Sequence, residues 1–94
     1  MYMRVVRFTD VDPDRVESLV AEINQADGPP EGMPMQGLQM LVDKDQRTAV
    51  VIQMFGSEDD MRSSEQTLNA MDASETPGTR STIDRGEVKL DMSA

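Results

Sequence analysis

The sequence predicts an α+β protein with the ferredoxin-like order β-α-β-β-α-β and a four-stranded antiparallel sheet. The strongest indication is the run Ala49-Val50-Val51-Ile52-Gln53-Met54-Phe55, which is apolar on both faces of a strand and leads through Gly56 into a helix. A polar turn at residues 43–46 precedes this run and indicates a hairpin. A second amphipathic helix follows an N-terminal strand.

The first strand and the first helix are predicted near the N-terminus. Residues 2–8 carry apolar side chains on both parities, which is typical of a strand buried on both faces. Asp12 followed by Pro13 indicates a helix start, because Asp is a good N-cap and proline at the first helical position loses no needed N–H bond. Residues 28–30, Gly-Pro-Pro, are expected to stop this helix. Its apolar stripe is formed by Val16, Leu19, Val20 and Ile23.

The middle of the chain predicts a loop and then an antiparallel hairpin. Residues 31–36, which are rich in Gly, Pro and Met, are expected to form the loop. Leu38, Met40 and Val42 alternate with polar residues and predict a half-buried strand. The turn at residues 43–46 then pairs this strand with residues 48–55.

The C-terminal half predicts a capped helix and a last strand. Ser57 and Asp60, three residues apart, resemble a capping box. Residues 72–80 are expected to form a loop, and residues 82–92 a strand with a bulge at Gly86. The apolar stripe of the second helix is thin and contains Met61, Ser64, Leu68 and Met71.

The burial pattern predicts the strand order and an assembly. The first and third strands are apolar on both faces and belong at the centre of the sheet, while the second and fourth alternate and belong at its edges. Two helices cover only one face of a four-stranded sheet, so the other face needs a partner. We expect a second copy of the chain, packed across a two-fold axis as a homodimeric α+β barrel.

Composition restricts the partners and the compartment. The 94 residues are expected to form one domain, 1–94, and a chain this short buries only about 60 to 65% of its unfolded surface. With 18 acidic and 9 basic residues the net charge is −9, which argues against nucleic acid and membrane surfaces as partners. The sequence has neither the roughly 18 apolar residues of a spanning helix nor the layout of a signal peptide. We therefore expect a cytoplasmic protein.

The chain resembles the antibiotic biosynthesis monooxygenase-like group of dimeric α+β barrels. The resemblance spans nearly the whole chain and is clearest in Leu41-Val42-Asp43, in residues 48–55, and in the helix start Gly56-Ser57-Glu58-Asp59-Asp60-Met61-Arg62-Ser63-Ser64-Glu65. It is most similar to small members of unassigned function. Characterised members include cofactor-free oxygenases of polyketide aromatics, quinol oxygenases and haem-degrading enzymes. The resemblance implies a fold more than a reaction, because this fold hosts many activities.

Two positions of this resemblance argue against haem chemistry. Members that oxygenate or degrade haem usually have Trp at the end of the third strand and often His about nine residues later. This chain has Phe55 and Ser64 there, and Ser is neither a haem ligand nor a base near neutral pH. The chain also lacks His, Cys and Trp entirely. We expect no cofactor, and no catalytic residue is assigned.

Several side chains are candidates for a ligand pocket between the sheet and the helices. Arg4 could bind a carboxylate or phenolate and Tyr2 could donate a hydrogen bond. Each polar candidate also has a structural interpretation: Arg4 as partner of an acidic residue at the dimer interface, Gln53 in a cross-strand bond, and Ser64 in close helix packing. The candidate ligand-binding residues are Tyr2, Arg4, Gln53, Phe55, Met61, Ser64 and Leu68.

The functional hypotheses differ in chemistry but share this pocket. The first is a homodimer that binds an apolar or aromatic small molecule. If this homodimer is an enzyme, we expect a cofactor-independent monooxygenase-like oxidoreductase. The alternative is a non-catalytic structural or interaction module, and isomerase or lyase action is a third option. No metal site is expected, because residues 10–14 and 58–60 place their carboxylates at predicted helix starts, where they stabilise the helix dipole.

Overall fold

The predicted order of elements is confirmed in a computed structural model of the chain. The structure describes residues 1–26, 33–70 and 76–92. The elements follow the ferredoxin-like order, and their bounds are β1 Tyr2–Thr9, α1 Pro13–Gln25, β2 Met35–Asp43, β3 Thr48–Phe55, α2 Glu58–Asn69 and β4 Thr79–Glu87.

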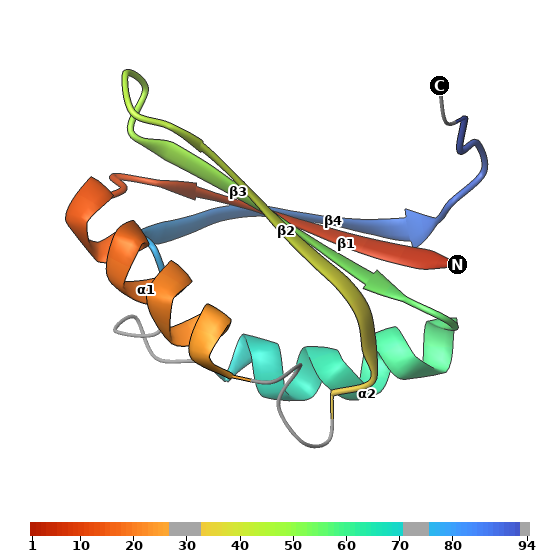
Figure 1. Cartoon of the computed structure of the whole chain (residues 1–94). Helices are drawn as coiled ribbons and strands as arrows, with labels where there is room; N and C mark the ends of the chain where they lie inside the picture. Colours follow the sequence, from red (N-terminus) through yellow and green to blue (C-terminus); the bar gives the residue numbers. More distant parts are fainter. Residues whose placement is uncertain (27–32, 71–75, 93–94) are drawn as a thin grey trace.

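The four strands form one antiparallel sheet in the order β2-β3-β1-β4. The two strands with apolar side chains on both faces, β1 and β3, are therefore central, as predicted. Both helices lie on the same side of the sheet, and the opposite side carries no element of this chain that the structure describes (Figure 1). We call these two faces the helix side and the open side.

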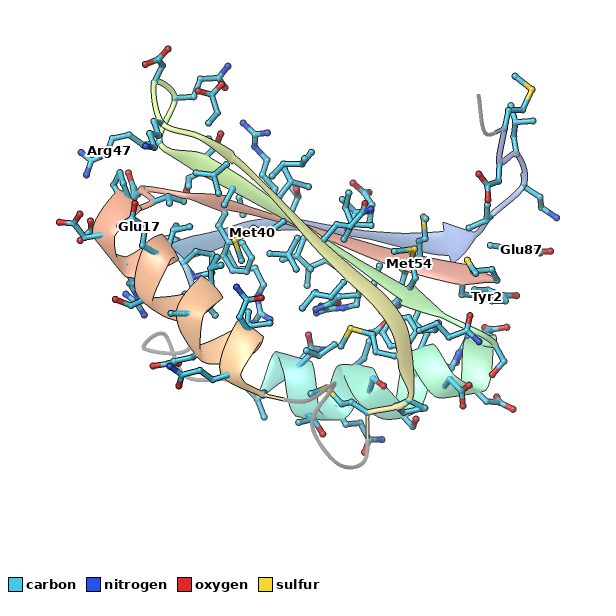
Figure 2. The ribbon with its side chains drawn as sticks, viewed as in Figure 1. Tyr2, Glu17, Met40, Arg47, Met54 and Glu87 are labelled. Carbon is cyan, nitrogen blue, oxygen red and sulfur yellow. The ribbon has the colours of Figure 1, made fainter. Side chains whose placement is uncertain are left out.

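Side chains of β3 alternate between the two faces, as the period of a strand requires. Ala49, Val51, Gln53 and Phe55 are buried on the helix side, whereas the residues between them are only half-buried. On the open side Ile52 lies opposite Val5, and Met54 lies opposite Met3. Figure 2 shows Met40 on the helix side and Met54 on the open side.

Local hydrogen bonds fix the starts of both helices and the hairpin turn. The Asp12 side chain accepts a bond from the Asp14 N–H at 3.0 Å. Ser57 Oγ accepts one from the Asp60 N–H at 3.2 Å, which satisfies a helix-start donor that has no partner within the helix. In the turn, Asp43 Oδ1 accepts bonds from the N–H groups of Asp45 and Gln46. The predicted caps and hairpin are confirmed.

The core on the helix side consists of two hydrophobic clusters. One contains Phe55, Met61, Leu68 and Met33, and the other contains Val6, Phe8, Val11, Val16, Ala49 and Val51. Between them, Arg4 on β1 lies opposite Gln53 on β3. A polar pair therefore separates the two clusters on the central strands.

The last strand differs from the predicted range 82–92. It begins at Thr79, within the predicted loop, and ends at Glu87, which lies opposite Tyr2 at the start of β1. Beyond this point β1 has no further residue with which β4 can pair. A single backbone hydrogen bond follows, from the Val88 N–H to the Met1 carbonyl at 2.9 Å. The length of the neighbouring strand therefore decides where β4 stops.

The bulge predicted at Gly86 is also wrong. Gly86 pairs regularly with Met3, and the register shift lies between Arg7 and Phe8, which oppose Thr82 and Arg80. Ser81 is the extra residue on β4. As a result, the regular alternation of side chains between the two faces of the sheet is interrupted at Ser81.

Strand β2 begins earlier than predicted. Met35 pairs with Phe55, because β3 is long enough to offer this partner, so the predicted loop 31–36 is shortened. The predicted helix stop at 28–30 and the contribution of Met71 lie outside the described residues, as does most of the predicted loop 72–80.

The cap on α2 leads to a stability prediction. Ser57→Ala should lower the free energy of unfolding by about 1 kcal/mol, because the Asp60 N–H loses its acceptor, whereas Ser57→Gly should cost only a few tenths. Urea denaturation followed by circular dichroism measures both. Equal stability of the three proteins would contradict the capping role.

Candidate functional site

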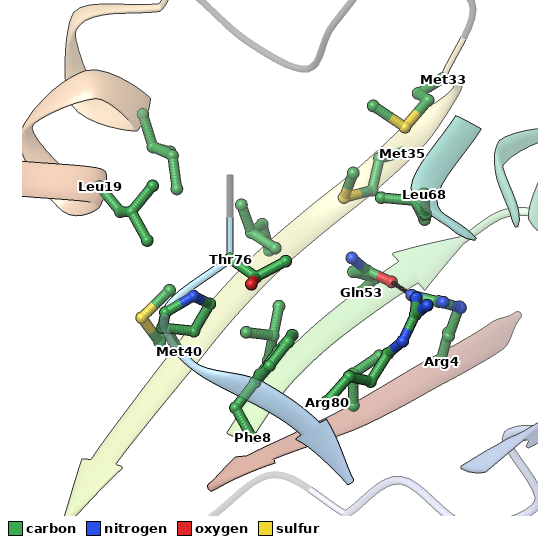
Figure 3. A pocket seen from close by; sticks show the side chains of 15 residues that line it. Arg4, Phe8, Leu19, Met33, Met35, Met40, Gln53, Leu68, Thr76 and Arg80 are labelled. Carbon is green, nitrogen blue, oxygen red and sulfur yellow. Dashed lines mark hydrogen bonds between the residues drawn. The ribbon is translucent and has the colours of Figure 1, made fainter. Parts of the chain in front are cut away.

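A cavity of about 180 Å³ lies between the helix side of the sheet and the helices (Figure 3). Its polar lining consists of Arg4, Gln53, Thr76 and Arg80. The rest of the lining is apolar and comes from both helices, three strands and the segments beside them: Val6, Phe8, Leu19, Ile23, Met33, Met35, Leu38, Met40, Val51, Leu68 and Pro77.

The cavity exists because α1 packs only at its start. Val16 is 7% exposed, while Ile23, further along the helix and in the cavity lining, is 44% exposed. Across the cavity, Leu38 on the edge strand β2 is 41% exposed. Apolar side chains on both walls therefore remain partly uncovered, and a ligand between them would bury them.

The centre of the polar lining is the guanidinium of Arg4, which is 2% exposed. Its Nη1 donates to Gln53 Oε1 at 2.8 Å, and its Nη2 donates to Asn69 Oδ1 at 2.9 Å. Burial lowers the pKa of Arg4 from its ordinary value, and the charge of Glu65 opposes this effect. Arginine stays protonated in proteins, so the site holds a buried positive charge.

Glu65 lies near this guanidinium but does not line the cavity. Glu65 is 8% exposed, and its carboxylate accepts a hydrogen bond from Arg85 Nη1 at 2.5 Å. Beside it on α2, Ser64 is fully buried, and its hydroxyl has no partner among the described residues. Ser64 thus permits close approach of α2 to the sheet, in agreement with its structural interpretation.

The structure brings three of the seven candidate residues into the cavity lining: Arg4, Gln53 and Leu68. Tyr2, Phe55 and Met61 pack with Leu68 in the adjoining cluster instead, and Ser64 is buried on α2 outside the cavity lining. Binding of a ligand by these residues stays a prediction.

The structural interpretations of Arg4 and Gln53 have different outcomes. The expected cross-strand bond of Gln53 is confirmed by its contact with Arg4. Arg4 as partner of an acidic residue at the dimer interface is wrong, because Arg4 faces the helices and its side-chain bonds go to amide oxygens.

Asn69 and Arg80 were not among the residues that the sequence predicted for the site. Asn69 is the last residue of α2, and Arg80 lay in the predicted loop. The register shift at Ser81 brings Arg80 opposite Phe8 and thus to the helix side. No pattern in the sequence marks this shift, so only the structure could bring Arg80 next to Arg4.

Tyr2 lies at the start of β1, near the start of α2 (Figure 2). Its hydroxyl donates to Glu58 Oε2 at 3.4 Å. Burial raises the pKa of Tyr2, and the charges of Glu58 and Glu87 raise it further, because the tyrosinate would be negative beside two carboxylates.

Residues 1–26, 33–70 and 76–92 contain no group of three or more His, Cys, Asp or Glu side chains that could hold a metal ion. The carboxylates at residues 58–60 lie in the first turn of α2, and Asp12 caps α1. In the same part of the chain, no helix is both long and apolar enough to cross a membrane.

Two solved structures share this architecture. A variant of MhuD with two manganese protoporphyrin IX molecules bound per active site matches over 100% of both chains, with a TM-score of 0.65 and 15% identity. A protein from Chloroflexus aurantiacus J-10-fl, named as an antibiotic biosynthesis monooxygenase, matches 98% of this chain and 96% of its own, with a TM-score of 0.63 and 11% identity. The chain has their fold. No protein-family model and no curated protein matches the sequence.

These similarities confirm, at the level of the fold, the resemblance to the antibiotic biosynthesis monooxygenase-like group. The residues of this chain do not fit a haem group. Protein ligands to haem iron are His, Cys, Tyr, or Met together with His; the chain has no His or Cys, and its one Tyr lies outside the cavity. A cavity of about 180 Å³ is also too small for a tetrapyrrole.

Tyr2 offers a pH-dependent measurement, because the chain has one Tyr and no Trp. The ultraviolet absorbance of tyrosinate should reveal a pKa above the ordinary value. Glu58→Gln should lower that pKa, because it removes a negative charge next to the hydroxyl. Glu17→Gln on the exposed surface of α1 is the control and should leave it unchanged. An unaltered midpoint in Glu58→Gln would contradict the contact.

Proposed function

We propose that the chain forms a homodimeric α+β barrel in which each subunit binds an apolar or aromatic small molecule. The observation that carries this proposal is the cavity of about 180 Å³ between the sheet and the helices. A dry engineered cavity of about 150 Å³ holds one benzene molecule. One aromatic ring therefore fits inside, and a second ring would extend between α1 and β2, where the apolar walls are partly exposed.

The lining supports this ligand class. Met33, Met35 and Met40 line the cavity, and unbranched thioether side chains adapt their shape to flat or irregular ligands. The few polar groups converge at one place, around Arg4 and Gln53, which is the usual arrangement of a small-molecule site. MhuD, which has the same fold, binds a flat aromatic macrocycle, and this also favours an aromatic ligand.

The open side of the sheet supports a homodimer. Its centre is apolar and half-exposed, with Val5 opposite Ile52 and Met3 opposite Met54. The edge strands place polar residues around this centre, among them Asp84 opposite Val5. An apolar centre with a polar rim is typical of protein interfaces.

The segment after β4 extends on the open side of the sheet (Figure 1). Leu90 is 77% exposed and Met92 is 83% exposed. Both follow Glu87, where the ladder with β1 ends. Burial of such side chains by a second subunit would stabilise the assembly, because exposed apolar area is costly in water.

The expected enzymatic activity, the structural alternative, the domain extent and the cellular location also remain proposals. Cofactor-independent monooxygenase-like activity is favoured only by the fold shared with the Chloroflexus protein, since Phe55 and Ser64 replace the usual Trp and His. A non-catalytic structural or interaction module is the alternative, and absence of ligand binding would favour it. One domain spanning 1–94 and a cytoplasmic location follow from the sequence arguments alone.

The homodimer is tested by Ile52→Asp. In a single subunit Ile52 is half-exposed, so the new carboxylate stays hydrated and the subunit folds. In a face-to-face dimer the charge would be buried without a partner, so light scattering should show a shift from dimer to monomer. Val20→Asp, at an exposed position of α1 on the other side of the sheet, should leave the dimer intact. A stable wild-type monomer at micromolar concentration would contradict the assembly.

Ligand binding is tested with the neutral dye prodan, whose aromatic part is a single two-ring naphthalene and which is excited where tryptophan does not absorb. We expect saturable fluorescence enhancement with one molecule per subunit. Leu19→Trp should fill the cavity and weaken binding about tenfold, a loss of about 1.4 kcal/mol.

Val20→Trp is the matched control, because Val20 is the next residue on α1 and does not line the cavity. Its affinity for the dye should equal that of the wild type. Failure of the wild-type protein to bind the dye, or equal weakening by both substitutions, would contradict the small-molecule site and favour the structural alternative.

A further inference from the structure

The charge of the cavity lining is opposite to the charge of the chain. The sequence has 18 acidic and 9 basic residues. Among the described residues that line the cavity, Arg4 and Arg80 are charged and none is acidic. The cavity is therefore a positive region within an acidic protein, and such a region attracts anions.

The Arg4 charge is buried without a direct carboxylate partner among the described residues. Its two side-chain hydrogen bonds go to neutral amide oxygens, those of Gln53 and Asn69. Its Nε has no acceptor within the described part of the chain. A buried charge of this kind is costly, and a negative group nearby would lower the cost.

Arg80 lies beside this guanidinium in Figure 3. Its Nη1 donates to Asn69 Oδ1 at 3.4 Å, the same oxygen that accepts from Arg4 Nη2 at 2.9 Å. One amide oxygen thus holds two positive groups close together. Burial lowers the pKa of Arg4, and the charge of Arg80 lowers it further, so the two cations repel each other.

Glu65 does not neutralise this pair. It is the nearby carboxylate that raises the pKa of Arg4, but it accepts a hydrogen bond from Arg85 and does not line the cavity. Glu65 therefore balances one of three neighbouring arginines. The cavity side of Arg4 and Arg80 keeps an excess of positive charge.

We propose that the ligand of this cavity is an aromatic carboxylate of one or two rings, with its carboxylate between Arg4 and Arg80 and its rings against the methionine and leucine walls. This inference rests on the proposed small-molecule site and names its ligand class. A carboxylate is the preferred group because guanidinium N–H donors match its two oxygens in geometry and charge.

The test compares two probes of nearly equal shape by calorimetry at low ionic strength. One is 2-naphthoate and the other is its neutral analogue 2-naphthamide. Naphthoate should bind the wild-type protein at least about tenfold more tightly, because hydrogen bonds to a charged group are the stronger ones. Added salt should reduce this preference, since Arg80 is exposed.

Arg80→Gln isolates the charge, because an exposed residue is replaced without loss of core packing. It should weaken naphthoate binding about tenfold and leave naphthamide binding unchanged. Arg62→Gln, on the exposed side of α2 and away from the cavity, should change neither affinity.

The outcomes separate this inference from the site on which it rests. Equal binding of both probes by the wild type would overturn the carboxylate assignment and leave the small-molecule site in place. Equal weakening of both probes by Arg80→Gln would also overturn it. Binding of neither probe, together with failure of the neutral dye, would overturn both proposals.

Discussion

Burial of one arginine on a central strand determines much of the remaining structure. Arg4 lies on β1 at a position that faces the helices, where an apolar side chain would have joined the two core clusters into one. Its guanidinium needs acceptors at that depth, and the amides of Gln53 and Asn69 supply them. The core is consequently divided at this level, between a cluster that includes Met61 and Leu68 of α2 and a cluster that includes Val16 of α1. The polar part of the cavity lining lies at this division.

The second constraint is the unequal cover of the sheet. Two helices in a β-α-β-β-α-β chain lie on one face, and the residues that alternate to the other face are Val50, Ile52 and Met54 on β3. A face of this composition is expensive in water for a chain of 94 residues, which has little core to compensate. The proposed dimer interface and the proposed ligand site therefore lie on opposite faces of the sheet. A substitution on one face should affect the other only through the backbone of β1 and β3.

Much of the fold could be predicted from local sequence patterns. The features that were predicted wrongly depend on contacts between residues far apart in the sequence. The two-faced strands, the caps at Asp12 and Ser57 and the turn at Asp43 are determined by nearby residues, so the sequence alone predicted them. The end of β4 depends on the length of β1, which lies more than 70 positions earlier in the chain, and alternation of Val88, Leu90 and Met92 could not report it. The site shows the same division. Arg4, Gln53 and Leu68 were predictable from strand parity and helix periodicity, whereas Arg80 depends on a register shift at Ser81.

The composition of the cavity favours recognition over acid–base chemistry. General acid–base catalysis needs a side chain that accepts a proton within hydrogen-bond reach of the substrate, and the described lining offers arginine, amide and hydroxyl groups instead. Arginine and amide groups do stabilise a negative charge, so a substrate that is already anionic, or that ionises readily, would be held in its charged form. Such an anion is the kind of substrate that the described lining would stabilise. The methionine walls then position its rings, and the chemistry would depend on the bound molecule more than on a proton acceptor of the protein.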